Sequence, residues 1–253
     1  MVLTSAWIAV MLVGGTWWVR RDITAYARFQ TQSDTTERQN LYRRWLVESF
    51  LVFVGASVVS LWLAHALWPF EGFPSAFTPA NRLLQSDEEV SSDRSLQIGI
   101  GLFVGIGLSL AIQWWRLKKS LSPRAGPDQA LIPRNRREAI LALLLSLNAG
   151  FSEELFFRLA LPLLLLQVTG SFAVSLVVSA LGFGLAHAHY GIKGMLATTA
   201  AGALLTVYYL DNGSLMRVMI AHAIIDIIAF FIRPAIGDWM ISRKAPRWAV
   251  AAS

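Results

Sequence analysis

The sequence contains no cysteine, and charged residues make up only 15% of its 253 residues. The absence of cysteine excludes a disulfide framework, a thiolate metal site and a cysteine nucleophile. Charged residues are so scarce, and hydrophobic residues so frequent at 55%, that the composition excludes an ordinary soluble domain. The composition therefore predicts a multi-pass membrane protein.

Apolar runs near the length that crosses a bilayer, about 20 residues, recur along the chain. The first run has no basic region before it and no small-residue cleavage site after it, so we expect a retained span. A shorter run at 160–168 is expected to be a half-helix or a continuation of the span before it. The sequence thus predicts an all-α membrane bundle of seven spans plus this partial helix, with eight spans as the alternative. The seven runs lie at 3–19, 46–68, 96–115, 139–157, 171–189, 192–210 and 214–232.

Positive charge is concentrated in the segments 20–44 and 116–137 and in the tail, whereas the segment 69–95 is mainly acidic. By the positive-inside rule the basic segments are cytoplasmic, which places the N-terminus of a seven-span protein outside. The net charge of +6 is then explained by topology and anionic lipid, and no nucleic-acid partner is expected.

The basic, proline-containing linker divides the chain into three parts. We expect N-terminal spans with basic loops at 1–136, a catalytic helical bundle at 137–233 and a basic cytoplasmic tail at 234–253. Arginine outnumbers lysine 18 to 4, which favours a bacterial source and hence a location in the bacterial cytoplasmic membrane.

Titratable side chains recur inside the apolar runs of the second half. Burial of an ionised group at the centre of a membrane helix costs on the order of 3 kcal/mol, so such residues are functional candidates by default. The set comprises Glu153, Glu154, Arg158, His187, His189, Arg217, His222 and Asp226.

Helical spacing separates the roles of the first three residues. Glu154 and Arg158 are four positions apart, so they share a helix face and are expected to form an ion pair. Glu153 points about 140° away from Arg158 in an α-helix and is left without an obvious partner. A carboxyl group of this kind in low dielectric suits general acid–base chemistry. The alternative is that all three side chains form one buried polar cluster that holds helices together.

The histidines show the same spacing of four. Phe183 and His187 share a face, as do His222 and Asp226, where a carboxylate can orient an imidazole. His187 and His189 differ by about 200° in an α-helix, so only one of them is expected in the site. We therefore expect His187 to be indispensable and His189 to be an interfacial residue that is dispensable for activity.

Three motifs together resemble those of the CPBP intramembrane protease family, which includes Rce1-type CAAX prenyl endopeptidases and bacteriocin-processing and immunity-associated (Abi) proteins. The motifs are Glu153-Glu154-x-x-x-Arg158, Phe183-x-x-x-His187 and His222-x-x-x-Asp226. The resemblance covers roughly residues 137–232. It implies an endopeptidase that acts on a membrane-associated protein or peptide.

By this resemblance, Glu153 and His187 activate a water molecule, and His222 and Asp226 stabilise the oxyanion. Glu154, Arg158 and Phe183 would support them. The family often has asparagine where this chain has Asp226, so Asp226 either donates a hydrogen bond in its protonated form or orients His222.

No cofactor is expected. If a divalent metal such as zinc bound, its ligands would be Glu153, His187 and His222. However, the chain lacks His-Glu-x-x-His, and the family that it resembles is described as glutamate-type, so a metal-free site is predicted.

Two other functions stay open. Buried carboxylates and histidines also mark proton-coupled transporters, although no inverted repeat is visible, and a protein with these motifs can serve as a non-catalytic immunity or scaffold protein. A serine protease of the rhomboid type is disfavoured because no glycine follows Ser152.

Overall fold

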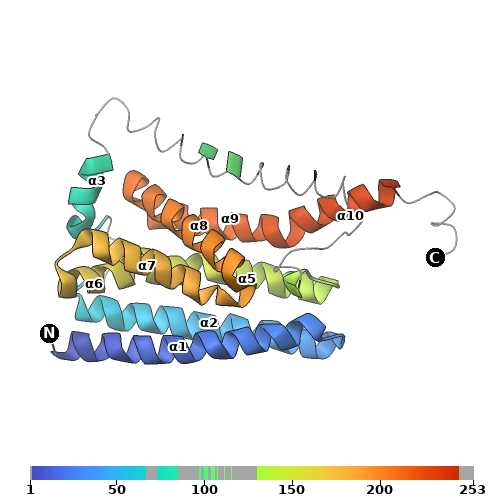
Figure 1. Ribbon diagram of the computed structural model, residues 1–253, viewed down its shortest axis with the longest axis horizontal. Coiled ribbons are helices and arrows are strands. Elements are labelled where there is room, and N and C mark those ends of the chain that lie inside the picture. Colours follow the sequence, from blue (N-terminus) through green and yellow to red (C-terminus); the bar gives the residue numbers. More distant parts are fainter. Residues whose placement is uncertain are drawn as a thin grey trace.

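The computed structural model describes residues 2–66, 73–84 and 130–244, together with single positions between 97 and 115. Every regular element within these residues is a helix, which confirms the all-helical prediction (Figure 1). The helices are α1 (Val2–Thr31), α2 (Thr35–Leu63), η1 (Ser75–Phe77), α3 (Thr78–Leu84), α5 (Arg136–Glu154), η4 (Leu155–Ala160), α6 (Leu161–Thr169), α7 (Phe172–Ala186), η5 (Ala188–Tyr190), α8 (Gly191–Asn212), α9 (Leu215–Ile227), η6 (Ile228–Ile232) and α10 (Arg233–Lys244).

Helices α1 and α2 are longer than the apolar runs predicted, and they lie side by side (Figure 1). The basic segment 20–44 is helical except at residues 32–34. Its arginines favour helix, and Arg28 lies in the last turn of α1, where positive charge suits the helix dipole. Asp34 begins α2 by accepting a hydrogen bond from the Glu37 amide at 2.9 Å, as an N-cap residue does.

Helices α5, η4 and α6 form one continuous helix of 34 residues, Arg136–Thr169. It begins at Asn135, whose side chain accepts from the Glu138 amide, and it ends at Gly170, which has a left-handed backbone. The middle part, η4, is a π-helix. The apolar run at 160–168 is therefore the continuation of the span before it, one of the two outcomes that the sequence left open, and it is no eighth span.

Helices α7 and α8 differ from the two spans expected at 171–189 and 192–210. Helix α7 has 15 residues, which extend about 22 Å and fall short of a hydrocarbon core of about 30 Å. The two helices are bent by 56° at the break between them. They pack closely, since a side chain at Gly184 would meet Thr199 and one at Gly202 would meet Phe183.

The number of spans therefore differs from the prediction. Among the described residues, four helices are long and apolar enough to cross a membrane, or five if the bent pair α7–α8 counts as one span. The seven predicted spans are not confirmed. Most of the run at 96–115 and most of the segment 69–95 lie outside the described residues. The same is true of residues 116–129 and 245–253. The orientation in the membrane stays a prediction.

Helix α5 lies between α2 and α9, and it contacts both along much of its length (Figure 1). A side chain at Gly150 would stand 2.6 Å from the backbone oxygen of Met219, so glycine permits the close approach of α5 to α9. This approach brings the glutamates at the end of α5 next to the histidine of α9. Large apolar side chains such as Val2, Val177 and Ile192 are exposed on the outside of the bundle, as a multi-pass membrane protein requires.

Candidate active site

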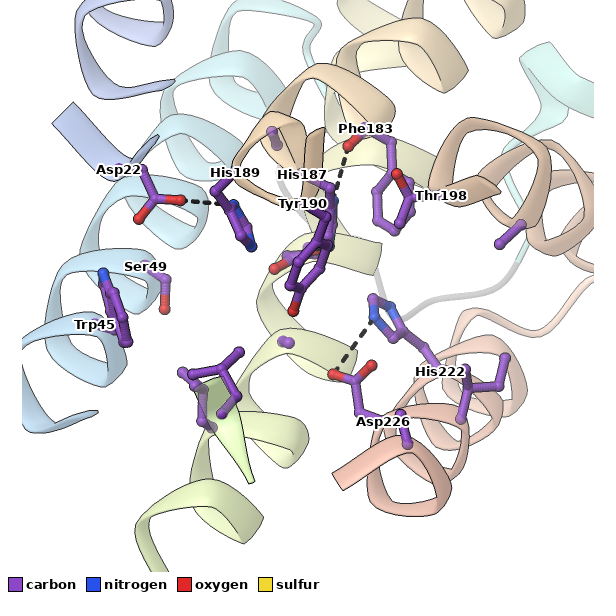
Figure 2. Close-up of a pocket in the computed structure, with 18 of the residues that line it drawn as sticks. Asp22, Trp45, Ser49, Phe183, His187, His189, Tyr190, Thr198, His222 and Asp226 are labelled. Carbon is purple, nitrogen blue, oxygen red and sulfur yellow. Dashed lines mark hydrogen bonds and ion pairs between the residues drawn. The ribbon is translucent and has the colours of Figure 1, made fainter. Parts of the chain in front are cut away.

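A cavity of about 270 Å³ lies among α1, α2, α5, α7, α8 and α9. Most helices contribute side chains spaced by four residues, because such residues share one helix face. Figure 2 shows the labelled residues around this cavity, with His222 and Asp226 opposite His189 and Asp22. The lining includes Trp18, Asp22 and Tyr26 of α1, Trp45, Ser49 and Phe53 of α2, Leu145, Ala149 and Glu153 of α5, and His222, Asp226 and Phe230 of the last long helix.

Glu153 is buried at the end of α5 and faces His187. Its Oε2 atom lies 3.8 Å from Nε2 of His187, which is too far for a direct hydrogen bond. Among the described residues this oxygen has no hydrogen-bond partner. The structure thus places Glu153 in the cavity without an arginine partner, as the spacing predicted.

His187 follows the last residue of α7 and caps that helix. Its Nδ1 atom lies 2.9 Å from the backbone oxygen of Phe183, and a carbonyl oxygen can only accept. Nδ1 therefore carries a proton in this arrangement, and in the neutral ring Nε2 is the nitrogen with a free lone pair. That lone pair is on the side of Glu153, so the two basic atoms face one another across a gap.

Glu154 lies at the centre of a buried polar network. One carboxylate oxygen is 2.9 Å from Nε of Arg158, which matches the ion pair predicted from their spacing. The other oxygen accepts from Nδ1 of His222 at 2.6 Å, a contact between residues 68 positions apart that the spacing could not reveal. Arg158 also lies over the ring of Phe183, 4.3 Å from its centroid, a favourable cation–π arrangement.

The network settles which carboxylate is hydrogen-bonded to His222. Glu154 contacts Nδ1 directly, whereas Asp226 Oδ2 lies 3.9 Å from Nε2 (Figure 2). Asp226 is close enough to interact with the ring but does not hydrogen-bond to it. Because Nδ1 is occupied by Glu154, Nε2 is the nitrogen of His222 that is available to a ligand beside Asp226.

The expectation for His189 rested on a continuous helix, and that premise is wrong. Helix α7 ends at Ala186, and residues 188–190 form the short 3₁₀ helix η5. His187 and His189 consequently line the same cavity, with ring centroids 5.9 Å apart. Nδ1 of His189 lies 2.7 Å from Oδ2 of Asp22 (Figure 2), so His189 lies at the cavity wall beside α1, and its dispensability stays a prediction.

The wall formed by α1 and α2 was missed by the sequence reasoning. Trp18, Asp22 and Tyr26 are four apart, as are Trp45, Ser49 and Phe53. This periodicity was visible in the sequence, but the neighbouring arginines led to the interpretation of 20–44 as a loop. Arg217 does not line the cavity.

Within the described part of the chain, no group of three or more histidine, aspartate or glutamate side chains is arranged to hold a metal ion. Glu153, His187 and His222, the ligands expected if a metal bound, all line the cavity. The metal-free site stays a prediction, which metal removal would test.

The site combines buried glutamates, histidines from two further helices and a membrane bundle, which is the arrangement of a candidate hydrolase within a membrane. Residues 135–228 match the model of the Rce1-like family, described as type II CAAX prenyl endopeptidase Rce1-like. This match supports the resemblance of the three motifs to the family of CPBP and CAAX proteases. No curated protein and no solved structure matches the chain.

Proposed function

We propose that the protein is an intramembrane endopeptidase that hydrolyses a peptide bond of a membrane-associated protein or peptide. The observation that carries this proposal is the 3.8 Å gap between Glu153 Oε2 and His187 Nε2. Two atoms at this separation can both accept a hydrogen bond from one water molecule placed beside them. A general base must lie within reach of the proton that it removes, and both basic atoms satisfy this condition.

In the first step the shared water attacks the carbonyl carbon of the substrate. Its oxygen forms the new C–O bond while one proton passes to Glu153, and the carbonyl oxygen takes up the negative charge. His187 holds the water through the lone pair of Nε2. The backbone oxygen of Phe183, 2.9 Å from Nδ1, fixes the tautomer that this role requires.

The oxyanion would lie on the other side of the cavity, between His222 and Asp226. Nε2 of His222 and Oδ2 of Asp226 are 3.9 Å apart, which again leaves room for one oxygen in contact with both groups. Nε2 donates to that oxygen when the ring carries both protons, and Glu154 at Nδ1 balances the resulting charge. Asp226 donates only when it is protonated.

The tetrahedral intermediate then collapses. Glu153 returns its proton to the leaving nitrogen as the C–N bond breaks, so that an acid and an amine are released and Glu153 is again a carboxylate. The cavity is lined largely by apolar and aromatic side chains, and such a lining strengthens these charge interactions relative to water.

The test is peptide cleavage by the purified protein in detergent, without any ion gradient. A library of membrane-anchored fluorogenic peptides is compared between the wild type, His187→Ala and His65→Asn. We expect cleavage by the wild type and a loss of about 10²–10⁴-fold in His187→Ala, the usual contribution of a catalytic acid or base. His65→Asn is the matched control, since His65 lies outside the cavity lining with a positive φ of 55° that asparagine tolerates.

A proton-coupled transporter would behave differently. It would move protons across liposomes under a gradient and would leave every peptide intact. That result would contradict the proposal, as would equal cleavage by the wild type and His187→Ala.

A further inference from the structure

We propose that Asp22 in α1 is a positioning residue for His187 and that it acts through His189. The inference rests on the proposed function, because it concerns the geometry of the water-activating pair. It assigns a role to a helix outside the segment 135–228 that matches the family. It also gives His189 a role that the helical periodicity did not predict.

The turn that directly follows His187 and carries His189 has few contacts of its own. It is a single 3₁₀ turn, η5, whose residues are not fully buried and whose beginning has no side-chain cap. It is followed by Gly191 with φ of +74°, a conformation that glycine adopts readily. Backbone hydrogen bonds of Tyr190 to His187 and of Gly191 to Ala188 hold the turn, and such short turns have poorer hydrogen-bond geometry than α-helices.

Side chains of α1 supply the missing constraint. Asp22 Oδ2 lies 2.7 Å from Nδ1 of His189, and both side chains are about 15% exposed. One helical turn further on, the ring of Tyr26 lies 5.0 Å from that of His189 and 5.6 Å from that of Tyr190. A carboxylate and an aromatic ring on one face of α1 thus contact the turn together.

The contact at His189 is transmitted to His187 over a short distance. The two histidines are separated by one residue, and their rings lie 5.9 Å apart. A shift of η5 would change the gap between His187 Nε2 and Glu153 Oε2, which is 3.8 Å. A misplacement of about 1 Å in a catalytic group can cost on the order of 10²-fold in rate, so the position of this turn matters for chemistry.

The kinetic experiment compares Asp22→Ala, Asp22→Asn and Glu48→Gln. We expect Asp22→Ala to lower kcat by about 10–100-fold with KM changed by less than about threefold, because the reacting geometry is altered and the substrate contacts are kept. Asp22→Asn keeps the size of the side chain but removes the charge that faces Nδ1 of His189 at 2.7 Å, and this nitrogen has no hydrogen-bond partner among the described residues, so the variant should recover only part of the activity. Glu48→Gln is the matched control, since Glu48 pairs with Arg21 of α1 but does not line the cavity, and it should leave kcat unchanged.

A second measurement separates this inference from the proposed function. The chain has four histidines, so an NMR spectrum of ¹⁵N-histidine protein contains four imidazoles that single substitutions assign. We expect Asp22→Ala, but not Glu48→Gln, to shift the signals of His187 as well as those of His189. If the wild type cleaves no peptide while these shifts appear, the proposed function fails and the positioning contact stands.

Two outcomes would overturn the inference. One is an unchanged His187 signal in folded Asp22→Ala. The other is a loss of activity that lies wholly in KM, which would make Asp22 a substrate-binding residue. A double variant, Asp22→Ala with His189→Ala, should be no less active than the worse single variant, because one contact is removed in all three.

Discussion

Two buried arginine–glutamate pairs occur in the part of the protein that the structure describes, and their surroundings differ. Arg38 of α2 and Glu138 of α5 are 100 positions apart and both fully buried. Most of their groups have partners: Arg38 donates to Glu138 and to the backbone oxygens of Ala130 and Ile132, while Glu138 also accepts from the Arg134 amide. Within the described residues, Nη1 of Arg38 is left without a hydrogen-bond partner. This pair holds α2, the segment before α5 and the start of α5 together.

The second pair, Glu154 and Arg158, lies in one helix and borders the cavity. Glu154 divides its two oxygens between Arg158 and His222, and among the described residues Nη2 of Arg158 has no hydrogen-bond partner. Its guanidinium lies over Phe183 instead. A buried pair whose groups are mostly hydrogen-bonded is expected to serve stability, whereas a pair with more unsatisfied atoms that is joined to a histidine is typical of a functional site.

The largest effect is expected at Glu153, the buried carboxylate that belongs to neither pair. Glu153→Gln keeps the shape of the side chain but removes the base, so we expect kcat to fall by about 10²–10⁴-fold with the unfolding temperature nearly unchanged. Cleavage assays and thermal unfolding in detergent would measure both. Near-normal cleavage by this variant would refute the assignment of Glu153 as the base.

Next in size is Glu154→Gln, which should affect activity and stability together. It leaves Arg158 buried without its anion and weakens the hydrogen bond to His222, so we expect about 3 kcal/mol less stability and at least a tenfold lower kcat. Thermal unfolding and kinetics on the same preparation would show this. A loss of stability alone would make Glu154 purely architectural.

Glu138→Gln should sharpen the comparison by lowering stability alone. Arg38 would lose its buried counter-ion, at a cost of about 3 kcal/mol, but neither residue lines the cavity. We therefore expect unchanged kcat per folded molecule at a temperature well below unfolding. The double variant Arg38→Met with Glu138→Leu should regain much of the stability, since it leaves no buried charge. A reduced kcat in fully folded Glu138→Gln would contradict this division between the two pairs.

The smallest effect is expected at Asp226, which no arginine contacts in the described structure and which lies 3.9 Å from His222. Because Glu154 already hydrogen-bonds to His222, we expect Asp226 to act as a donor to the oxyanion. Asp226→Asn keeps a donor and should retain activity within about threefold, whereas Asp226→Leu should lose at least tenfold. If the asparagine variant lost an order of magnitude or more, the orienting role would be the correct one.

Much of this site could be predicted from local periodicity. The spacing of Glu154 and Arg158 predicted their ion pair, and the angle of Glu153 predicted its separation from Arg158. The contact of Glu154 with His222 could not be predicted, because it joins two helices whose distance depends on Gly150 and its fit against α9. Helical periodicity fails once the helix ends.

The fold was predictable in class and less so in detail. Apolar runs located the long helices, and the motifs located the family segment. The run at 171–189 contains no proline, and the end of α7 at Ala186 is marked in sequence only by Gly191 five residues later. The run was therefore interpreted as one continuous helix, in which His189 would point away from the cavity that His187 lines. The role of α1 and α2 was missed because arginines inside a long helix resemble a polar loop.

The π-helix η4 has a consequence for how relatives of this chain are compared. A π turn holds more residues than an α turn, so η4 is the natural place for a helix to gain or lose one residue without breaking. A relative that lacked this residue would close the wide turn into an α turn, and the side chains on both sides of it would keep the faces that they have here. In a homologous pair, a one-residue gap in this helix should therefore fall within Leu155–Ala160, and neither the two glutamates before it nor the leucines after it would have to change in compensation.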